Sequence, residues 1–414
     1  MDLLLAVQLK YKKERMNAIQ KQQLLQNVNQ IDLAILKSIL DQGFISLDEF
    51  REAGLDYNKV EELDAINRIK EQGTVNESAK QNVLNAINNN QSTVDEIQMN
   101  LSNGIITIAD LQQSTNLSPK SIQLLVNLNT AGRTTIFRTI EDLPPMEEGK
   151  TDVYFVGVPG SGKSTILSGL LYMAHKKGLL LNNSHNQGGA QYQDLLINDM
   201  RKGLLPAATA SGSYNYIPLS LQGEDGAHPL NVVEVPGENY NQMYNNGDVE
   251  SFLNYINNGN KKIIIFVIDS LVHNEGYVNN ANQLDQSLVY ANILELFRAN
   301  QVLEKTDSVY IVVNKFDAIK NTRYFGDARP DTELALDFVQ DEFLAFVNNC
   351  KNARENSRNQ FKIKIIPFSI GEVQLSTFVN YINEDFCFNL LNNIINDSFI
   401  QRGGRTGKGW RIFN

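Results

Sequence analysis

A short stretch in the middle of the chain, YFVGVPGSGKST from Tyr154 to Thr165, restricts the possible folds more than any other feature. It begins as an apolar strand, continues through three glycines and ends where the apolar spacing predicts a helix over Thr165–Lys177. The stretch therefore fits the pattern G-x-x-x-x-G-K-[ST] in its required strand–loop–helix setting. Backbone N–H groups of such a loop turn inward around a polyphosphate, and a helix N-terminus favours the negative charge.

The chemistry of this loop assigns a role to each of its polar residues. We expect Lys163 to neutralise the β and γ phosphates and Ser164 to bind Mg²⁺. The residues predicted to surround the phosphates are Gly157, Pro159, Gly160, Ser161, Gly162, Lys163, Ser164 and Thr165.

Strand and helix patterns alternate from Thr151 onward, which predicts a mostly parallel sheet with crossover helices. The expected strands are Val153–Val156, Asn215–Leu221, Asn231–Val235, Lys262–Asp269, Ser308–Val313 and Lys362–Phe368. The expected helices are Thr165–Lys177, Tyr192–Met200, Asn279–Ala299, Asp331–Asn352 and Glu384–Phe399. Only nine residues separate the second strand from the third, so these two should form an antiparallel hairpin.

Two further motifs follow strands of this sheet. Glu234 ends the third strand and Gly237 comes three residues later, where a carboxylate can reach Mg²⁺ through water and a backbone N–H can meet a γ-phosphate. Asn314-Lys315-Phe-Asp317 follows the fifth strand. Asp317 can accept two hydrogen bonds from guanine, Lys315 can lie along the ring, and Asn314 can bridge to the glycine-rich loop.

With these three motifs in order at strand ends, residues 150 to 400 resemble the translation-factor-related, Ras-like class of P-loop GTPases. Ser369-Ile370-Gly371 resembles the motif of that class whose backbone contacts the guanine carbonyl. The resemblance implies a three-layer α/β domain over residues 151–400 that binds GTP or GDP with Mg²⁺ and hydrolyses GTP.

The chain departs from the pattern of that class at positions that concern catalysis. Glu234 replaces an aspartate, and Glu238 stands where a glutamine often orients the attacking water. A carboxylate beside a γ-phosphate is repelled unless it is protonated or paired, so we expect slow hydrolysis or hydrolysis completed by a partner. Thr209 is the candidate for the magnesium-binding threonine of the first switch, with Ser211 and Ser213 as alternatives, and it can equally be a plain loop residue. The expected catalytic residues are thus Lys163, Thr209 and Glu238, and the expected metal ligands are Ser164, Thr209 and Glu234.

Residues 1–140 read as a helical module, and residues 141–150 as a turn-rich linker. Within the module, the segment around Gly43 lines up with the segment around Gly104, and Ser46 and Thr107 are the expected helix caps. A weaker copy around Gly73 is also expected. Tandem helix–turn–helix units can bind DNA, but Asn58–Leu63 carries one Lys against two Glu, which disfavours that use. We expect a partner-binding or self-associating module, with a structural spacer as the alternative.

The charge of the chain is spread evenly, with 15 Lys and Arg against 20 Asp and Glu up to Lys150 and 22 against 27 beyond it. This distribution does not indicate nucleic-acid binding. The two cysteines, the absence of a secretory signal pattern and the lack of a long apolar run predict a cytoplasmic protein without a transmembrane segment. Residues 401–414 form a basic tail.

The sequence therefore predicts a guanine-nucleotide-binding switch whose slow, Mg²⁺-dependent GTP hydrolysis controls the helical module or a protein partner. A non-hydrolysing, nucleotide-bound scaffold and a P-loop ATPase remain as alternatives.

Overall fold

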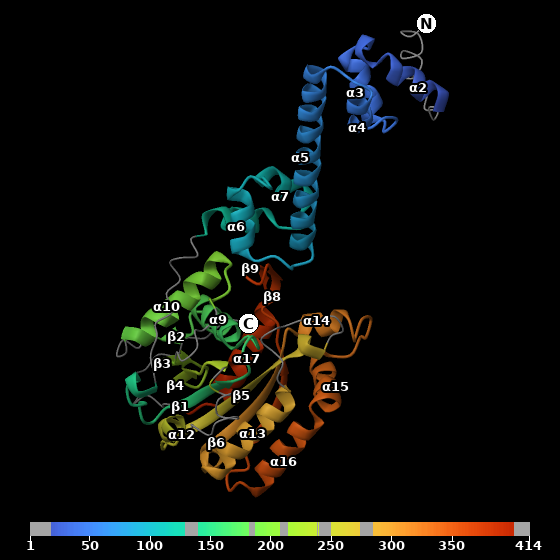
Figure 1. The fold of residues 1–414 in the computed structure, drawn as a ribbon. Helices are drawn as coiled ribbons and strands as arrows, with labels where there is room; N and C mark the ends of the chain where they lie inside the picture. Colours follow the sequence, from blue (N-terminus) through green and yellow to red (C-terminus); the bar gives the residue numbers. More distant parts are fainter. Residues whose placement is uncertain are drawn as a thin grey trace. The chain divides into compact units, whose positions relative to one another are not determined.

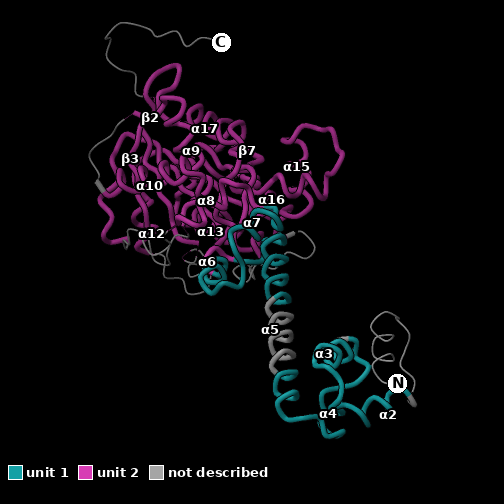
Figure 2. The backbone as a smooth tube through the Cα atoms, turned by 90° about the horizontal axis from the view of Figure 1, so that it is seen from above, with its two compact units in different colours: residues 1–92, 96–116 teal, residues 93–95, 117–414 magenta. Residues whose placement is uncertain are grey.

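The computed structural model describes residues 18–128, 140–181, 187–207, 214–237, 239, 250–273 and 285–400. The chain folds into two compact units, which Figure 2 shows in different colours. The first comprises residues 1–92 and 96–116, and the second comprises residues 93–95 and 117–414. Helix α8 (Pro119–Asn127), which the sequence assigns to the helical module, thus belongs to the second unit.

The second unit is built on a seven-stranded sheet in the order β2-β3-β4-β1-β5-β6-β7 (Figure 1). Strands β4, β1, β5, β6 and β7 run parallel to their neighbours in this order, whereas β3 is antiparallel to both β4 and β2. The antiparallel pair β3–β4 is the hairpin predicted from its short connection. The strands are β1 (Thr151–Val156), β2 (Leu180–Leu181), β3 (Asn215–Gln222), β4 (Ala227–Glu234), β5 (Lys261–Asp269), β6 (Thr306–Asn314) and β7 (Lys362–Pro367).

Helices cover both faces of this sheet, which gives the expected three layers. Alternate residues of β1 point to opposite faces: Tyr154 and Val156 join one apolar cluster, and Val153 and Phe155 join the other. The first cluster includes residues of α12 (Glu250–Ile256), α13 (Gln286–Ala299), α15 (Asp331–Glu342) and α16 (Leu344–Asn356). The second includes residues of α9 (Lys163–Lys176), α10 (Gln187–Lys202) and α17 (Glu384–Asp397).

Several elements of this unit differ from the sequence predictions, which also lack β2 and α12. The helix predicted over Asp331–Asn352 is broken at Phe343 into α15 and α16. A short helix, α14 (Phe316–Asn321), follows β6 directly. A two-stranded sheet of β8 (Gly371–Gln374) and β9 (Phe378–Ile382) was not predicted at all.

The first unit consists of helices, and the two segments that the sequence aligns have the same local structure. Gly43 and Gly104 both have φ = 69°, a left-handed conformation that glycine adopts without steric cost. Ser46 and Thr107 each form a capping box with an acidic residue three positions later. The helices are α2 (Ala18–Gln26), α3 (Leu33–Asp41), α4 (Leu47–Glu52), α5 (Tyr57–Asn88) and α7 (Ile108–Ser114), and α6 (Val94–Ser102) has residues in both units.

Side-chain contacts extend this correspondence beyond the aligned motifs. The ion pair Lys21–Glu49 (Nζ–Oε1 2.6 Å) has a counterpart in Lys80–Asp110 (Nζ–Oδ1 2.6 Å). Asn29 and Asn88 also make equivalent contacts with their side chains. Asn29 donates to the carbonyl of Gly54 and accepts from the N–H of Asp56. Asn88 donates to the carbonyl of Ser114 and accepts from the N–H of Asn116. The weaker third copy around Gly73 is wrong, because α5 runs unbroken from Tyr57 to Asn88.

A buried polar network holds the segment before β1 against the sheet. Asp152 accepts hydrogen bonds from Asn231 (2.8 Å) and Asn260 (2.9 Å), and both of these amides also donate to the carbonyl of Glu147 at 2.8 Å. Lys262 Nζ lies 3.7 Å from Asp152 Oδ2, and both side chains are fully buried. The predicted linker 141–150 is therefore bound near the amino-terminal ends of β1 and β5 and beside the middle of β4.

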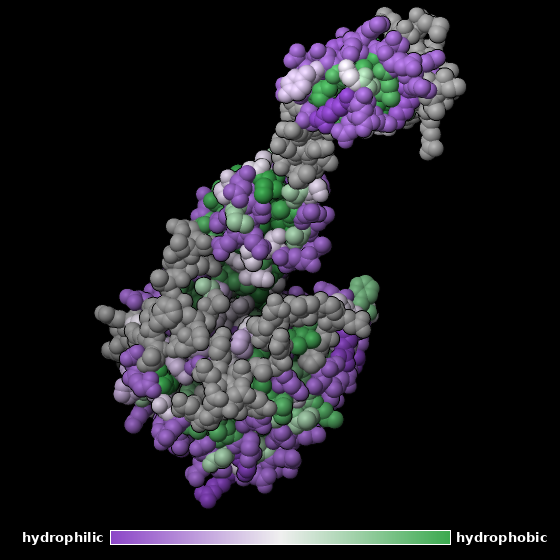
Figure 3. All heavy atoms as spheres, in the orientation of Figure 1, coloured by the Kyte–Doolittle hydropathy of each residue, from purple (hydrophilic) through white to green (hydrophobic). Residues whose placement is uncertain are grey.

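The surface is mainly hydrophilic on the face that Figure 3 shows, with hydrophobic residues interspersed. Such scattered apolar exposure is normal for a folded domain. Within the described ranges, no helix is both long enough and apolar enough to cross a membrane.

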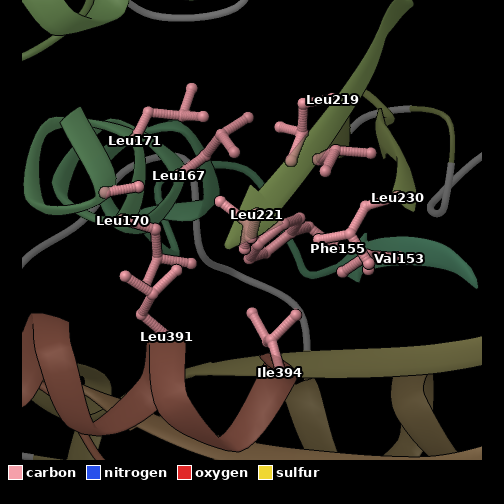
Figure 4. A pocket seen from close by; sticks show the side chains of 12 residues that line it. Val153, Phe155, Leu167, Leu170, Leu171, Leu219, Leu221, Leu230, Leu391 and Ile394 are labelled. Atoms are coloured by element: carbon pink, nitrogen blue, oxygen red, sulfur yellow. The ribbon is translucent and has the colours of Figure 1, made fainter. Parts of the chain in front are cut away.

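An apolar cavity of about 20 Å³ lies between the sheet and helices α9 and α17 (Figure 4). Its twelve lining residues are all apolar and include Phe155, Leu170, Val232 and Leu391. Because this lining offers a water molecule no hydrogen-bond partner, we expect the cavity to stay dry.

Replacing Val232 by isoleucine is expected to raise the free energy of unfolding by about 0.5–1 kcal/mol, because the added methylene enters this cavity. Urea unfolding measures the change. The control is Val233→Ile, since Val233 is fully buried in the cluster on the other face of the sheet. Overpacking there should lower the free energy of unfolding by about 1–3 kcal/mol. Equal effects of the two substitutions would contradict the position of the cavity.

Candidate functional site

The glycine-rich loop, Gly157–Gly162, connects β1 to α9 as the sequence predicts. Gly160 and Gly162 have φ of 76° and 92°, and Gly162 is the residue from which α9 begins. A Cβ at Gly162 would lie 2.2 Å from Asn314 Nδ2, so a larger residue does not fit there. The helix dipole and the backbone N–H groups at the start of α9 favour an anion at this end of the helix.

Two polar side chains of this segment are buried. Lys163, 7% exposed, donates from Nζ to the carbonyl oxygen of Gly157 at 2.8 Å. The hydroxyl of Ser161 is buried and makes no hydrogen bond within the described part of the chain. A phosphate oxygen in the loop would supply the missing partner of Ser161.

Glu234, at the carboxyl end of β4, lies against the start of α9 with only 1% of its surface exposed. Ser164 Oγ donates to Glu234 Oε1. The other carboxylate oxygen, Oε2, accepts from the hydroxyl of Tyr192 at 2.6 Å and from Asn215 Nδ2 at 3.4 Å. The glutamate that replaces the expected aspartate therefore reaches the hydroxyl of Ser164 directly.

The oxygen atoms of Ser164 and Glu234 suit Mg²⁺, which takes one or two protein oxygens together with water and phosphate oxygens. Across the described residues, no group of three His, Cys, Asp or Glu side chains forms a metal cage. Gly237 lies against the glycine-rich loop, since a Cβ there would be 2.4 Å from the backbone nitrogen of Pro159. A side chain at position 237 would therefore clash with the loop, and only the backbone of a glycine fits there.

The predicted base-binding motif is joined to the glycine-rich loop by hydrogen bonds. Asn314 Nδ2 donates to the carbonyl oxygen of Ser161 at 2.7 Å, which is the bridge predicted from the sequence. Lys315, in a left-handed conformation with φ = 56°, donates to Asp269 at 2.8 Å and to the carbonyl of Gly160 at 3.3 Å. Asp317 lies in the first turn of α14 and is exposed.

Ser369 and Ile370 lie beside this motif. The backbone N–H of Phe316 donates to the carbonyl of Phe368 at 3.0 Å, which ties the start of α14 to the end of β7. Ser369 and Ile370 are 2% and 6% exposed, and Ser369 Oγ accepts from the N–H of Gly371 at 3.1 Å. The structure thus brings together the glycine-rich loop, Glu234, Asn314–Asp317 and Ser369–Ile370 at the carboxyl ends of the parallel strands.

Comparisons with known proteins add little to this geometry. No protein-family model matches the chain, and no curated protein matches it. Among solved structures, the chain is similar to one described as "Signal recognition particle receptor SRb-GTP/SRX complex from Chaetomium thermophilum", with 14% identity and a TM-score of 0.32. The match covers 59% of this chain and 99% of that chain.

Several predicted residues fall outside the described ranges, and some contacts at the site were not predicted. Thr209, Ser211, Ser213 and Glu238 lie outside the described residues.

No sequence pattern indicates Tyr192 or Asn215, since both reach Glu234 only through the tertiary fold. Asp269 caps the turn after β5 by accepting from the N–H of Leu271 at 3.2 Å, and it also pairs with Lys315.

Proposed function

We propose that this protein binds a guanine nucleotide with Mg²⁺ at the edge of its sheet and acts as a nucleotide-dependent switch. The observation that carries the proposal is the hydrogen bond from Asn314 to the carbonyl of Ser161. It joins the loop suited to phosphates to the motif suited to guanine, so that one nucleotide can reach both.

Each part of the nucleotide has residues of matching chemistry. Lys163 and the loop amides would bind the phosphates, together with the N–H of Gly237 and the hydroxyl of Ser161. Ser164 and Glu234 would hold Mg²⁺, which would offset the charge on the phosphate oxygens, and Thr209 is the candidate third ligand. Asp317 would accept from guanine N1–H and N2, with Lys315 along the ring and the backbone of Ser369 and Ile370 at the guanine carbonyl.

We expect hydrolysis to be slow, because Glu238 places a carboxylate where a neutral side chain often orients water. Single-turnover assays of purified protein distinguish a slow GTPase from a non-hydrolysing scaffold. Release of phosphate over minutes to hours supports the GTPase. If no phosphate is released even with protein partners present, nucleotide binding serves assembly alone.

The β8–β9 hairpin gives the proposed switch a route to helix α8. Ser118 and Ser121 of the α8 N-terminus donate to Asn380 Oδ1 at 2.8 and 2.9 Å. Strand β9 and the turn before it also contact the segment after α10, where the N–H of Val379 donates to the carbonyl of Gly203 at 2.8 Å and the N–H of Leu205 donates to the carbonyl of Thr377. The hairpin begins directly after Ser369–Ile370, and Gly203 precedes the candidate first switch.

We therefore expect nucleotide state to alter how α8 or a protein partner docks, which a pull-down with GDP-loaded and GTP-analogue-loaded protein measures.

Replacing Lys163 by methionine is expected to lower GTP affinity about 10- to 100-fold, because a charged hydrogen bond is worth about 1.5–3 kcal/mol. Equilibrium binding of labelled GTP measures the loss. The matched control is Lys176→Met on the same helix, since Lys176 pairs with Glu384 on the surface. An unchanged affinity of the Lys163 variant would contradict the phosphate site.

A further inference from the structure

Glu234 has one more methylene group than the aspartate expected at its position, and its carboxylate therefore has one more rotatable bond to fix. Both of its oxygens are engaged, Oε1 by Ser164 and Oε2 by Tyr192 and Asn215. The Tyr192 contact is much the shorter of the two on Oε2, at 2.6 Å against 3.4 Å. Tyr192 is therefore the main anchor of the oxygen that faces away from Ser164.

The phenol of Tyr192 is itself held in place. Tyr192 is 5% exposed and belongs to the same apolar cluster as Leu196 and Ile197, one turn further along α10. Ser168 of α9, fully buried, donates to the carbonyl of Leu196 at 3.0 Å. Helix α10 is thus fixed against α9, the helix that carries Ser164.

From this arrangement we infer that Tyr192 is a positioning residue, which holds Glu234 so that Oε1 is presented beside Ser164, where Mg²⁺ would bind. The inference rests on the proposed nucleotide site. Because its hydroxyl donates to Glu234, Tyr192 would act through that carboxylate and not directly on the metal or the nucleotide. It acts by preventing the longer glutamate side chain from rotating away, so that a glutamate serves where an aspartate is usual. Outer partners of metal ligands generally act in this way, and their loss costs about 10- to 100-fold in metal affinity.

The test is Tyr192→Phe, which removes the hydroxyl and keeps the ring in the core. The Mg²⁺ concentration for half-maximal binding of a fluorescent GTP analogue should rise about tenfold or more. Binding of the same analogue in excess chelator should change less than about twofold, because the phosphate and guanine contacts are untouched.

Tyr310→Phe is the matched control, since Tyr310 is fully buried and its hydroxyl donates to Asp397 Oδ2 at 2.8 Å in a contact that does not involve the nucleotide site. Both variants should melt at a lower temperature, but only Tyr192→Phe should shift the Mg²⁺ midpoint. An unchanged midpoint in Tyr192→Phe, or an equal shift in both variants, overturns the inference and leaves the nucleotide site standing. If the wild-type protein binds no guanine nucleotide, the proposed function fails, and the role of Tyr192 fails with it.

Discussion

Replacing Asp317 by asparagine is expected to change the preferred base from guanine to xanthine. In the proposed site the carboxylate would accept from N1–H and from the N2 amine of guanine, whereas the asparagine amide would offer a donor that suits the carbonyl at C2 of xanthine. Two hydrogen bonds to a charged group, at about 1.5–3 kcal/mol each, correspond to a 10²- to 10⁴-fold loss of GTP affinity. Competition between GTP and xanthosine triphosphate for the purified variant measures the exchange.

The fold should tolerate this substitution, because Asp317 is exposed in the first turn of α14. Asp285→Asn is the control, since Asp285 is the exposed N-cap of α13 and asparagine caps a helix equally well. Asp285→Asn should change neither the affinity for GTP nor the affinity for xanthosine triphosphate. If Asp317→Asn keeps its preference for GTP, Asp317 does not read the base.

Removing the carboxylate of Asp152 should lower the free energy of unfolding by about 3–5 kcal/mol, because Asp152→Ala leaves Lys262 buried without its counter-charge. Burial already lowers the pKa of Lys262 to about 8, and Asp152 partly offsets this effect. The amides of Asn231 and Asn260 lose an acceptor as well. Urea unfolding at pH 7 measures the loss.

A double variant separates the buried pair from general damage to the core. Asp152→Ala combined with Lys262→Met removes both charges, so it should recover much of the loss seen in Asp152→Ala alone. GTP binding by folded protein should be unaffected, since the network lies at the amino-terminal ends of the strands and the proposed site at the carboxyl ends. Strictly additive losses would show that the two charges do not interact.

The sequence predicted the elements of this fold whose signals are local. The loop from Gly157 to Gly162, the strands with continuous apolar runs and the β3–β4 hairpin all follow from residue pattern and spacing. The bridge from Asn314 to Ser161 was also predictable, because both motifs stand at strand ends that meet at one edge.

Other features have weak or misleading local signals. The turn between β8 and β9 has positive φ at Leu375 and Ser376. Turns of this kind are usually marked by Asn-Gly, and this turn lacks that pattern. Neither Gly nor Pro marks the break at Phe343, where burial of the ring accompanies the change of direction. Gly73 resembled a turn but lies inside α5, where a single glycine costs only about 1 kcal/mol.

The contacts that hold Glu234 could not be predicted from the sequence. Tyr192 and Asn215 come from a helix and a strand that precede Glu234 by 42 and 19 residues. Nothing in the local pattern around Tyr192 distinguishes it from an ordinary core aromatic. Its hydroxyl reaches Glu234 only when α10 packs against β3 and α9.

Calorimetric titration of the wild-type protein with GTP and with ATP, both with Mg²⁺, decides whether the sheet edge holds a guanine-nucleotide site. We predict one GTP site per chain and affinity for ATP at least about 100-fold lower, because adenine cannot supply the two hydrogen bonds that Asp317 is proposed to accept. Equal or tighter binding of ATP, or no binding of either nucleotide, would contradict the proposed function.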